Sequence, residues 1–453
     1  MSNLFLENSV PALLLQIADK KIGFGDLAET CAAAIEKFEP ATHAWVCSDL
    51  AQVRAGAERA QKEFKAGEPL RALEGMPFGI KDIFNTRTFP TEMGSKLWKG
   101  FTPGNNARVV DAVLGAGGVA AGKTVTAEFA VHALNDTLNP HDPNLTPGTS
   151  SSGSAAAVAR GMVPFALGTQ TAGSIVRPAS FCGIWGMKPS FGLIPRTGVL
   201  KTTDSLDTIG FLATHGDSLR PLLDAIRVRG PDYPFVYRNV DKAGDRPKAQ
   251  GRPWRVGVVR THTWDGARDY ARAAVDSLAK KIAATPGWEV VDLPWPEEMQ
   301  STHTVHAQIY AKSLAYYFQQ EAKSLKEISP IMARMIEEGR AVPNDVYRNA
   351  LGAQENLSAI VDEVFSGIDV VLSLGTSSTA PPRDETELPD PSLIWTLCHV
   401  PSVGIPVTRS PAGLPLGVQM TARRWNDYLL LQAIEELVEK GVLPKGSQAV
   451  KDH

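Results

Sequence analysis

The sequence predicts an α/β fold, in which helices cover a β-sheet, and two observations support this. Amphipathic segments, with apolar residues at three- and four-residue spacing between charges, alternate with short apolar runs typical of buried strands. In addition, 43% of the 453 residues are hydrophobic, so the chain can bury a large core. Length alone suggests two or three domains, and one large α/β domain stays open on this ground.

In the first part of the chain, helical and strand patterns alternate. The expected elements are surface helices over 9–39 and 49–66, a buried strand over 76–84, a helix, glycine turn and short strand over 108–130, and a helix beginning after Gly153. The strand at 76–84, MPFGIKDIF, carries Lys81 and Asp82, an unusual place for two charges.

The pattern changes between about 222 and 370. We expect a polar surface loop over 236–254, strands over 254–260 and 288–295, a helix over 267–284, and long helices near 300–325 and 345–366. Strand patterns at 368–377 and 400–410 could rejoin the sheet, and a helix over 425–440 closes the chain.

Charge and cysteine usage exclude several classes of protein. The net charge of −3 comes from 46 basic and 49 acidic residues without long runs, so we expect no nucleic acid and no membrane as partner. No apolar run approaches the length of about 20 residues that spans a bilayer. The four cysteines lack C-x-x-C spacing, which favours a reducing, cytoplasmic setting and no metal: Cys31, Cys47, Cys182 and Cys398.

The serine-rich stretch 147–180, PGTSSSGSAAAVARGMVPFALGTQTAGSIVRPAS, is too well patterned to be a flexible linker. Its first serines stand where a helix begins, and small hydroxyl side chains cap free N–H groups there. Ser174 follows Thr171, Ala172 and Gly173, small residues that let a turn expose consecutive N–H groups. Such a turn can bind an oxyanion and hold a nucleophile beside it.

A nucleophilic serine needs a base, and no histidine sits in a G-x-S-x-G pattern with Ser174. Lys81 is the alternative, because an apolar strand lowers the pKa of a buried lysine and lets the neutral amine accept a proton. A second serine could relay that proton.

At this point the sequence closely resembles the amidase signature family of serine hydrolases. The resemblance is carried by MPFGIKD (76–82), GAGGVAAGKTVTAEFA (115–130), PGTSSSGSAAAVARG (147–161), LGTQTAGSIVRPASFCGIWGMKPS (167–190), SLDTIG (205–210) and, more weakly, PSVGIPV…GLPLGVQM (401–420). The family implies a single domain with a large mixed, mostly parallel β-sheet between helices. Within it we expect N-terminal helices over 1–69, a signature core over 70–220, a divergent region lining the substrate cleft over 221–395, and C-terminal strands and a helix over 396–453.

The resemblance also implies roles for individual residues. It places the nucleophile at Ser174, the bridging serine with a cis peptide bond at Ser150, and the lysine at Lys81. The oxyanion hole would be formed by backbone N–H groups of Thr171, Ala172, Gly173 and Ser174, and Ser151 would support the hydrogen-bond network. The implied reaction is hydrolysis of a small-molecule amide through an acyl-enzyme, without cofactor or metal.

The sequence departs from the common family pattern at three places. Thr149 stands where a glycine usually precedes the cis bond, and TQTAGSIVR replaces T-D-T-G-G-S-I-R, so that Gln170 replaces Asp and Val176 occupies the Arg position. An arginine reappears as Arg177, as in the malonamidase-like branch, where it recognises a substrate carboxylate. We therefore assign Arg177 and Gln170 to substrate binding, with the alternative that Arg177 is tied to an acidic residue or to backbone carbonyls.

Other residues and functions carry less weight. Asp82 is expected to be structural, Lys123 and Glu128 to form a structural pair or loop anchors, and Cys182 to be inert packing. The residues expected at the wall of the substrate cleft are Trp395, Cys398, His399, Tyr310 and Tyr316. Competing functions are the catalytic component of an amidotransferase, which releases ammonia from glutamine for tRNA-linked amidation, a hydrolase of a urea-derived compound, and a non-catalytic scaffold. The sequence leaves open whether the chain works alone, as a homodimer or with a partner protein.

Overall fold

A computed structural model describes residues 3–65, 69–229 and 251–450, so most of the loop expected over 236–254 lies outside the described residues. Its strands form one 11-stranded sheet in the order β1-β3-β2-β4-β6-β5-β10-β11-β9-β7-β8. Their bounds are β1 Trp45–Ser48, β2 Pro77–Lys81, β3 Val119–Thr124, β4 Phe165–Gln170, β5 Trp185–Lys188, β6 Thr208–Ala213, β7 Trp254–Val259, β8 Trp288–Leu293, β9 Val370–Leu374, β10 Ser402–Arg409 and β11 Pro415–Thr421.

The sheet is mixed, as predicted, but the expectation that it is mostly parallel is wrong. Among the described strands, only β2 with β3 and β4, and β7 with β8 and β9, pair in parallel. The other six pairings are antiparallel. The difference lies in the middle of the sheet, where β6, β5, β10 and β11 follow one another in antiparallel order. Helix α7 connects β4 to β5, but these two strands do not pair with each other, because β6 lies between them and runs antiparallel to both.

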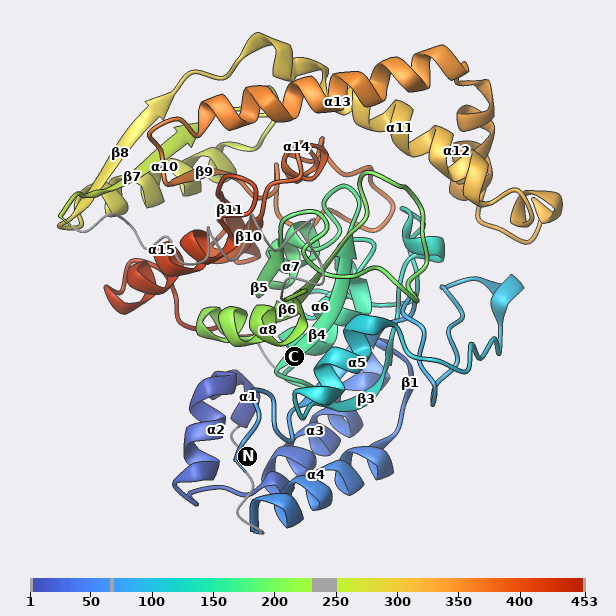
Figure 1. Cartoon of the computed structure of the whole chain (residues 1–453), viewed down its shortest axis with the longest axis vertical. Coiled ribbons are helices and arrows are strands. Elements are labelled where there is room, and N and C mark those ends of the chain that lie inside the picture. Colours follow the sequence, from blue (N-terminus) through green and yellow to red (C-terminus); the bar gives the residue numbers. More distant parts are fainter. Residues whose placement is uncertain (1–2, 66–68, 230–250, 451–453) are drawn as a thin grey trace.

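Helices cover the sheet and extend beyond it at both ends of the molecule (Figure 1). Those of the first half are α1 Leu4–Glu7, α2 Val10–Ala18, α3 Phe24–Phe38, α4 Leu50–Lys65, α5 Arg108–Gly115, α6 Ser152–Ala159, α7 Val176–Cys182 and α8 Leu219–Ile226. Those of the second half are α10 Asp269–Ala283, α11 Thr302–Tyr317, α12 Pro330–Ala341, α13 Asn344–Val364, α14 Ser392–Leu397 and α15 Asp427–Glu439. In Figure 1, α11, α12 and α13 lie at the end of the molecule opposite α3 and α4.

Two helical regions differ from the sequence expectation. The pattern over 9–39 forms two helices, α2 and α3, because the chain turns between them, where Lys20 adopts a φ of 59°. Helix α12 was not predicted, although its start signal is present. Ser329 accepts a hydrogen bond from the backbone N–H of Met332, and Pro330 occupies the first helical position.

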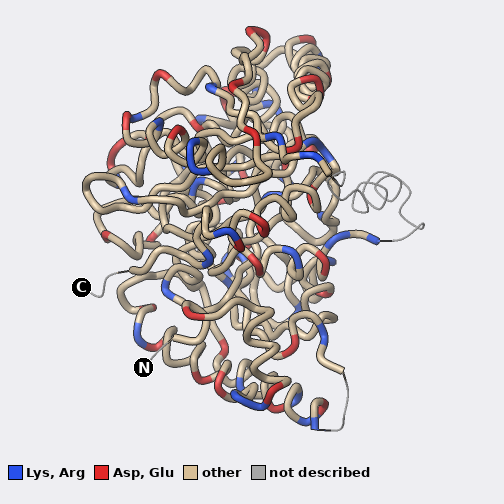
Figure 2. Tube along the Cα trace, turned by 90° about the vertical axis from the view of Figure 1, so that its left-hand side faces the viewer, with Lys and Arg blue, Asp and Glu red and all other residues tan. Residues whose placement is uncertain are grey.

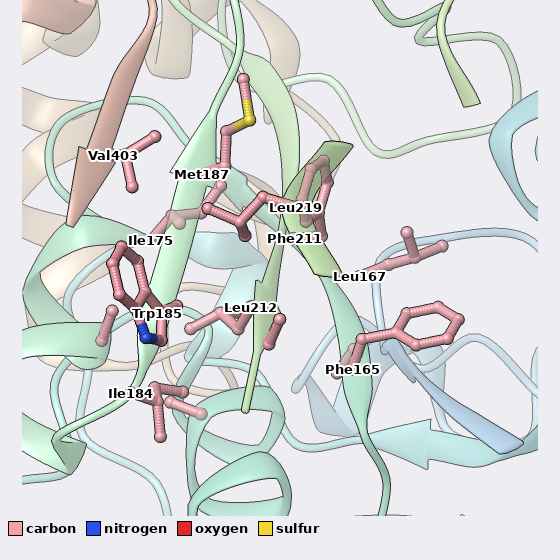
Figure 3. Close-up of a cluster of buried hydrophobic side chains, with 14 of the residues drawn as sticks. Phe165, Leu167, Ile175, Ile184, Trp185, Met187, Phe211, Leu212, Leu219 and Val403 are labelled. Carbon is pink, nitrogen blue, oxygen red and sulfur yellow. The ribbon is translucent and has the colours of Figure 1, made fainter. Parts of the chain in front are cut away.

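The hydrophobic core follows the central strands of the sheet. Figure 3 shows apolar side chains of β4, β5 and β6 meeting in one cluster, including Phe165, Trp185 and Phe211, all 0% exposed. Figure 2 shows basic and acidic residues interspersed along the trace. Within the described residues, no helix is long and apolar enough to cross a membrane.

The sheet brings the predicted site residues to one edge. Strands β2 and β4 are parallel neighbours, with Ile80 opposite Leu167, so their carboxyl ends carry Lys81 and Gln170 to the same edge. Strand β6 runs antiparallel to β4, with Thr208 opposite Gln170, so the residue before β6, Asp207, lies at that edge too. Carboxyl ends of parallel strands are a common place for ligand sites in α/β proteins.

Candidate active site

Lys81 ends β2 and is completely buried, with its side-chain nitrogen surrounded by hydroxyl groups. Nζ lies 2.8 Å from Ser150 Oγ, 3.0 Å from Ser151 Oγ and 2.8 Å from Thr169 Oγ1. Among the described residues no carboxylate forms an ion pair with Lys81. Burial therefore lowers the pKa of Lys81 well below its ordinary value of 10.5, and the more distant charge of Asp207 opposes this shift only in part.

A neutral amine fits these three contacts, since it has two N–H groups and one lone pair. The Ser151 hydroxyl donates to the Thr169 carbonyl oxygen at 3.2 Å, so Ser151 accepts a hydrogen bond from Lys81. The lone pair of the Lys81 nitrogen can then accept a hydrogen bond from the hydroxyl of Ser150 or of Thr169. In this arrangement Lys81 can take a proton from Ser150.

Ser150 and Ser151 stand directly before helix α6, and the peptide bond between Thr149 and Ser150 is cis. Helix α6 packs unusually close to the loops beneath it. A Cβ atom on Gly153 would come within 2.3 Å of the Ala44 carbonyl oxygen and 2.4 Å of the Val125 nitrogen. Only a helix of small side chains fits here, which explains the run SGSAAAVA. The small residues that resemble a linker in the sequence thus place two serines beside Lys81.

The loop from Thr171 to Ser174, here called the serine loop, is held in place by hydrogen bonds to its carbonyl groups. His306 Nε2 donates to the Thr171 carbonyl at 2.8 Å, Thr396 Oγ1 to that of Ala172 at 2.6 Å, and the Arg177 N–H to that of Gly173 at 2.9 Å. The N–H groups of Ala172, Gly173 and Ser174 form no hydrogen bond with the described part of the chain. Carbonyls bound on one side and free N–H groups beside a serine make a loop that can stabilise an oxyanion.

Comparison with known proteins identifies the family. The family model described as Amidase matches residues 26–431. This chain belongs to the amidase signature family. It is 30% identical over 450 residues to the A subunit of the glutamyl-tRNA(Gln) amidotransferase of Chloroflexus aggregans (strain MD-66 / DSM 9485), covering 90% of this chain and 91% of that protein. It is therefore an enzyme of the amidase class, and its α/β fold with a mixed sheet is the family fold.

Two further relatives bear on the function of this amidase. It is 29% identical over 448 residues to the 1-carboxybiuret hydrolase subunit AtzE of Pseudomonas sp. (strain ADP), covering 94% of this chain and 97% of that protein. A solved structure from work on an unexpected vestigial protein complex and the origins of an s-triazine catabolic enzyme superposes with a TM-score of 0.86 at 27% identity, over 98% of this chain and 100% of that one.

Gln170 holds the serine loop of this amidase together from within. Its side-chain oxygen accepts from the N–H groups of Ile175 at 2.9 Å and Val176 at 3.0 Å, and its amide donates to Thr396 Oγ1 at 2.9 Å. These contacts occupy the amide on the loop itself. The predicted assignment of Gln170 to substrate binding finds no support in this geometry, which gives it a positioning role instead.

Arg177 is enclosed by protein groups. Its Nε and Nη2 donate to the Thr149 carbonyl oxygen at 3.2 and 3.0 Å, and its Nη1 lies 2.7 Å from Glu387 Oε2 and 3.3 Å from Asp390 Oδ2. The sequence offered two alternatives for Arg177, a substrate carboxylate or a tie to acidic residues and backbone carbonyls. The contacts present are those of the second alternative.

Asp207 anchors the start of the serine loop and was missed at the level of sequence, although the motif SLDTIG contains it. Its carboxylate accepts from Thr171 Oγ1 at 2.9 Å and from the N–H groups of Thr202 at 2.7 Å and Thr203 at 3.0 Å. The hydroxyls of Thr202 and Thr203 donate to it as well. These hydrogen bonds satisfy the buried carboxylate without a salt bridge and fix Thr171 beside it. Threonines spaced along a short loop before a strand were the available signal.

Two histidines and a tyrosine lie near the serine loop. His306 and Tyr310 are buried on α11, and the ring of His132 meets Tyr310 edge-on at 6.2 Å between centroids. Burial lowers the pKa of His132 to about 3 and that of His306 to about 4, so both imidazoles are neutral at neutral pH. Two other residues expected at the cleft wall differ in their exposure. Tyr316 is 67% exposed, whereas Trp395 is fully buried against Trp295.

Lys123 and Asp82 form a buried ion pair on the strands beside Lys81, with 2.8 Å between Lys123 Nζ and Asp82 Oδ1. Lys123 also donates to the carbonyls of Phe84 at 3.0 Å and Pro90 at 2.9 Å, and so anchors the loop after β2. Glu128, the partner expected for Lys123, instead accepts from Ser95 Oγ and from the Ser329 N–H. Of the two alternatives expected for Lys123 and Glu128, a structural pair or loop anchors, the contacts are those of loop anchors.

Proposed function

We propose that this amidase cleaves a small-molecule carboxamide to a carboxylate and ammonia or an amine, with Ser174 as nucleophile. The observation that carries the proposal is the completely buried Lys81 amine, which is contacted by hydroxyls only and whose pKa is lowered well below 10.5 by burial. An amine with a lowered pKa is neutral, and so able to accept a proton, at a lower pH than an ordinary lysine.

The proposed proton path combines the contact between Lys81 and Ser150 with the role that the family resemblance implies for Ser174. Ser174 Oγ attacks the amide carbon as Ser150 takes its proton and passes its own to Lys81 Nζ, 2.8 Å away. The backbone N–H groups of Thr171, Ala172, Gly173 and Ser174 stabilise the oxyanion, and Asp207 holds Thr171 in place by accepting a hydrogen bond from its hydroxyl. The C–N bond then breaks while the proton returns through Ser150 to the leaving nitrogen. Water, activated by the same relay, releases the acid from Ser174. Ser151 acts as a positioning residue for Lys81.

A specific relationship favours a second candidate, in which the chain is the catalytic component of a complex. One relative is the A subunit of an amidotransferase, and another is a subunit of 1-carboxybiuret hydrolase. In that case glutamine or a urea-derived compound would replace the simple amide, and a partner protein would be needed. Basic and acidic residues are interspersed along the trace (Figure 2), which favours a small-molecule substrate over direct nucleic-acid binding. The four free cysteines favour a cytoplasmic setting.

The test is ammonia release by the purified chain from a panel of amides that includes glutamine, next to Ser174→Ala. Release by the wild type from simple amides, lost in Ser174→Ala, supports the stand-alone hydrolase. Release from glutamine only after a partner protein is added supports the second candidate. Equal rates in the two proteins on every amide would show that Ser174 is not the nucleophile.

A further inference from the structure

The acidic side chains of Glu387 and Asp390 contact the guanidinium of Arg177 at Nη1, whereas its Nε and Nη2 contact Thr149. Glu387 and Asp390 lie on the segment between β9 and α14, far along the chain from the serine loop. The side chains of Arg177 and Asp390 are 7% and 10% exposed, and that of Glu387 is 23% exposed. One cation therefore stands against two acids inside the protein, close to Ser174.

A guanidinium binds a carboxylate best through two parallel N–H groups. In Arg177 the Nε and Nη2 edge points at the Thr149 carbonyl oxygen, and Nη1 points at the two acids. No edge offers a free pair of N–H groups. A substrate carboxylate placed here would have to displace Glu387 or Asp390, or stand beside groups of its own charge.

Asp390 reaches from Arg177 to the serine loop itself. A Cβ atom built on Gly173 would come within 1.9 Å of Asp390 Oδ2, so only glycine allows this approach. Oδ2 accepts no hydrogen bond from the described residues, although it lies near the Arg177 cation. The remainder of the residue is fixed, because Oδ1 accepts from the Ser392 N–H at 2.8 Å and the carbonyl accepts from His303 Nε2 at 3.1 Å. Asp390 Oδ2 is therefore a hydrogen-bond acceptor beside Gly173, the residue before Ser174.

We propose that Glu387 and Asp390 set the charge preference of the site, so that the enzyme selects amides with an uncharged acyl group that offers an N–H or O–H donor and rejects those with a carboxylate near the scissile bond. This inference rests on the proposed function, because it concerns substrates of the same site. Arg177 then positions the acids and the Thr149 carbonyl, and binds no substrate carboxylate.

Malonamide and malonamate test the preference, because they differ only in an amide group replaced by a carboxylate. We expect wild type to show a kcat/KM at least about tenfold higher for malonamide. The double substitution Glu387→Gln and Asp390→Asn keeps the shapes and removes the charges, and it should move the ratio at least about tenfold towards malonamate. Glu385→Gln, an exposed acid on the same segment, is the matched control and should leave the ratio unchanged.

A wild-type preference for malonamate, or a ratio that the double substitution leaves unchanged, would overturn the proposal. If the double variant does not fold, Asp390→Asn alone is expected to shift the ratio in the same direction, and an unchanged ratio would again count against the proposal. Calorimetric binding of both compounds to Ser174→Ala measures the preference without turnover. Absence of catalysis by the wild type would contradict the proposed function. Tighter binding of malonamate than of malonamide to Ser174→Ala would contradict the charge preference.

Discussion

Two buried lysines on neighbouring strands, Lys81 on β2 and Lys123 on β3, occupy opposite chemical environments. Both are 0% exposed. Lys123 faces the Asp82 carboxylate at 2.8 Å and the carbonyls of Phe84 and Pro90, which favour the ammonium. Lys81 faces three hydroxyls, which accommodate the neutral amine equally well.

The comparison shows that burial alone does not make a lysine a base. Burial lowers the pKa of both amines, but the Asp82 carboxylate opposes the shift at Lys123, and no group in contact with Lys81 does the same. Removing a paired lysine leaves its partner charge buried alone and destabilises the fold, whereas an unpaired buried lysine itself costs stability and gains reactivity. The account therefore predicts that changes at the two lysines separate activity from stability.

The largest effect is expected from Lys81→Met. Loss of the base should lower kcat/KM for amide hydrolysis on the order of 10⁴-fold or more, as for members of other serine triads. The free energy of unfolding should change by less than about 1 kcal/mol, because methionine fills the space without a buried amine. Ammonia release and urea denaturation measure the two quantities, and Lys62→Met on an exposed helix face is the control. Activity within tenfold of wild type would break the comparison.

Lys123→Met should act on stability instead. Removing the lysine leaves the Asp82 carboxylate buried without its partner, and such losses cost about 3 to 5 kcal/mol. Urea denaturation checks this value. Combining it with Asp82→Leu should recover part of the loss, since no buried charge then remains. A cost below about 1 kcal/mol would mean that the pair does not hold this part of the fold.

The pH dependence sharpens the difference further. Only neutral Lys81 accepts a proton, so kcat/KM should rise about tenfold per pH unit below its pKa and level off above it. Because that pKa is well below 10.5, the plateau should be reached well below the pH at which an ordinary lysine titrates. A rise that continues to pH 10.5 would assign Lys81 an ordinary pKa. The free energy of unfolding should also rise with pH between the pKa of Lys81 in the folded protein and 10.5. In that range the unfolded chain binds the lysine proton and the folded chain does not.

The smallest predicted effect concerns Thr396, which links Gln170 to the Ala172 carbonyl. Thr396→Val removes both hydrogen bonds at constant shape and should lower kcat about tenfold by loosening the serine loop, with little change in KM. Thr396→Ser keeps the hydroxyl and should restore kcat. Equal activities of the two variants would show that the loop does not depend on this contact.

What the sequence could predict depended on how local the signal was. Lys81, Ser150 and Ser174 stand in short motifs, and the structure brings Lys81 and Ser150 into contact. Thr396 is 226 residues from Gln170, so no local pattern joins them, and Glu387 and Asp390 likewise meet Arg177 only through the fold. The order of the central strands escaped prediction for the same reason, because antiparallel pairing between β5 and β10 is not encoded in either segment.

The most direct test of the central claim is an NMR titration of the two lysines in protein carrying ¹³C-labelled lysine, with Lys81→Met to assign the signal of Lys81. We predict that Lys81 loses its proton well below pH 10.5 and before Lys123, which its Asp82 partner keeps charged to higher pH. A Lys81 signal that titrates at or above pH 10.5, or after Lys123, would contradict the account.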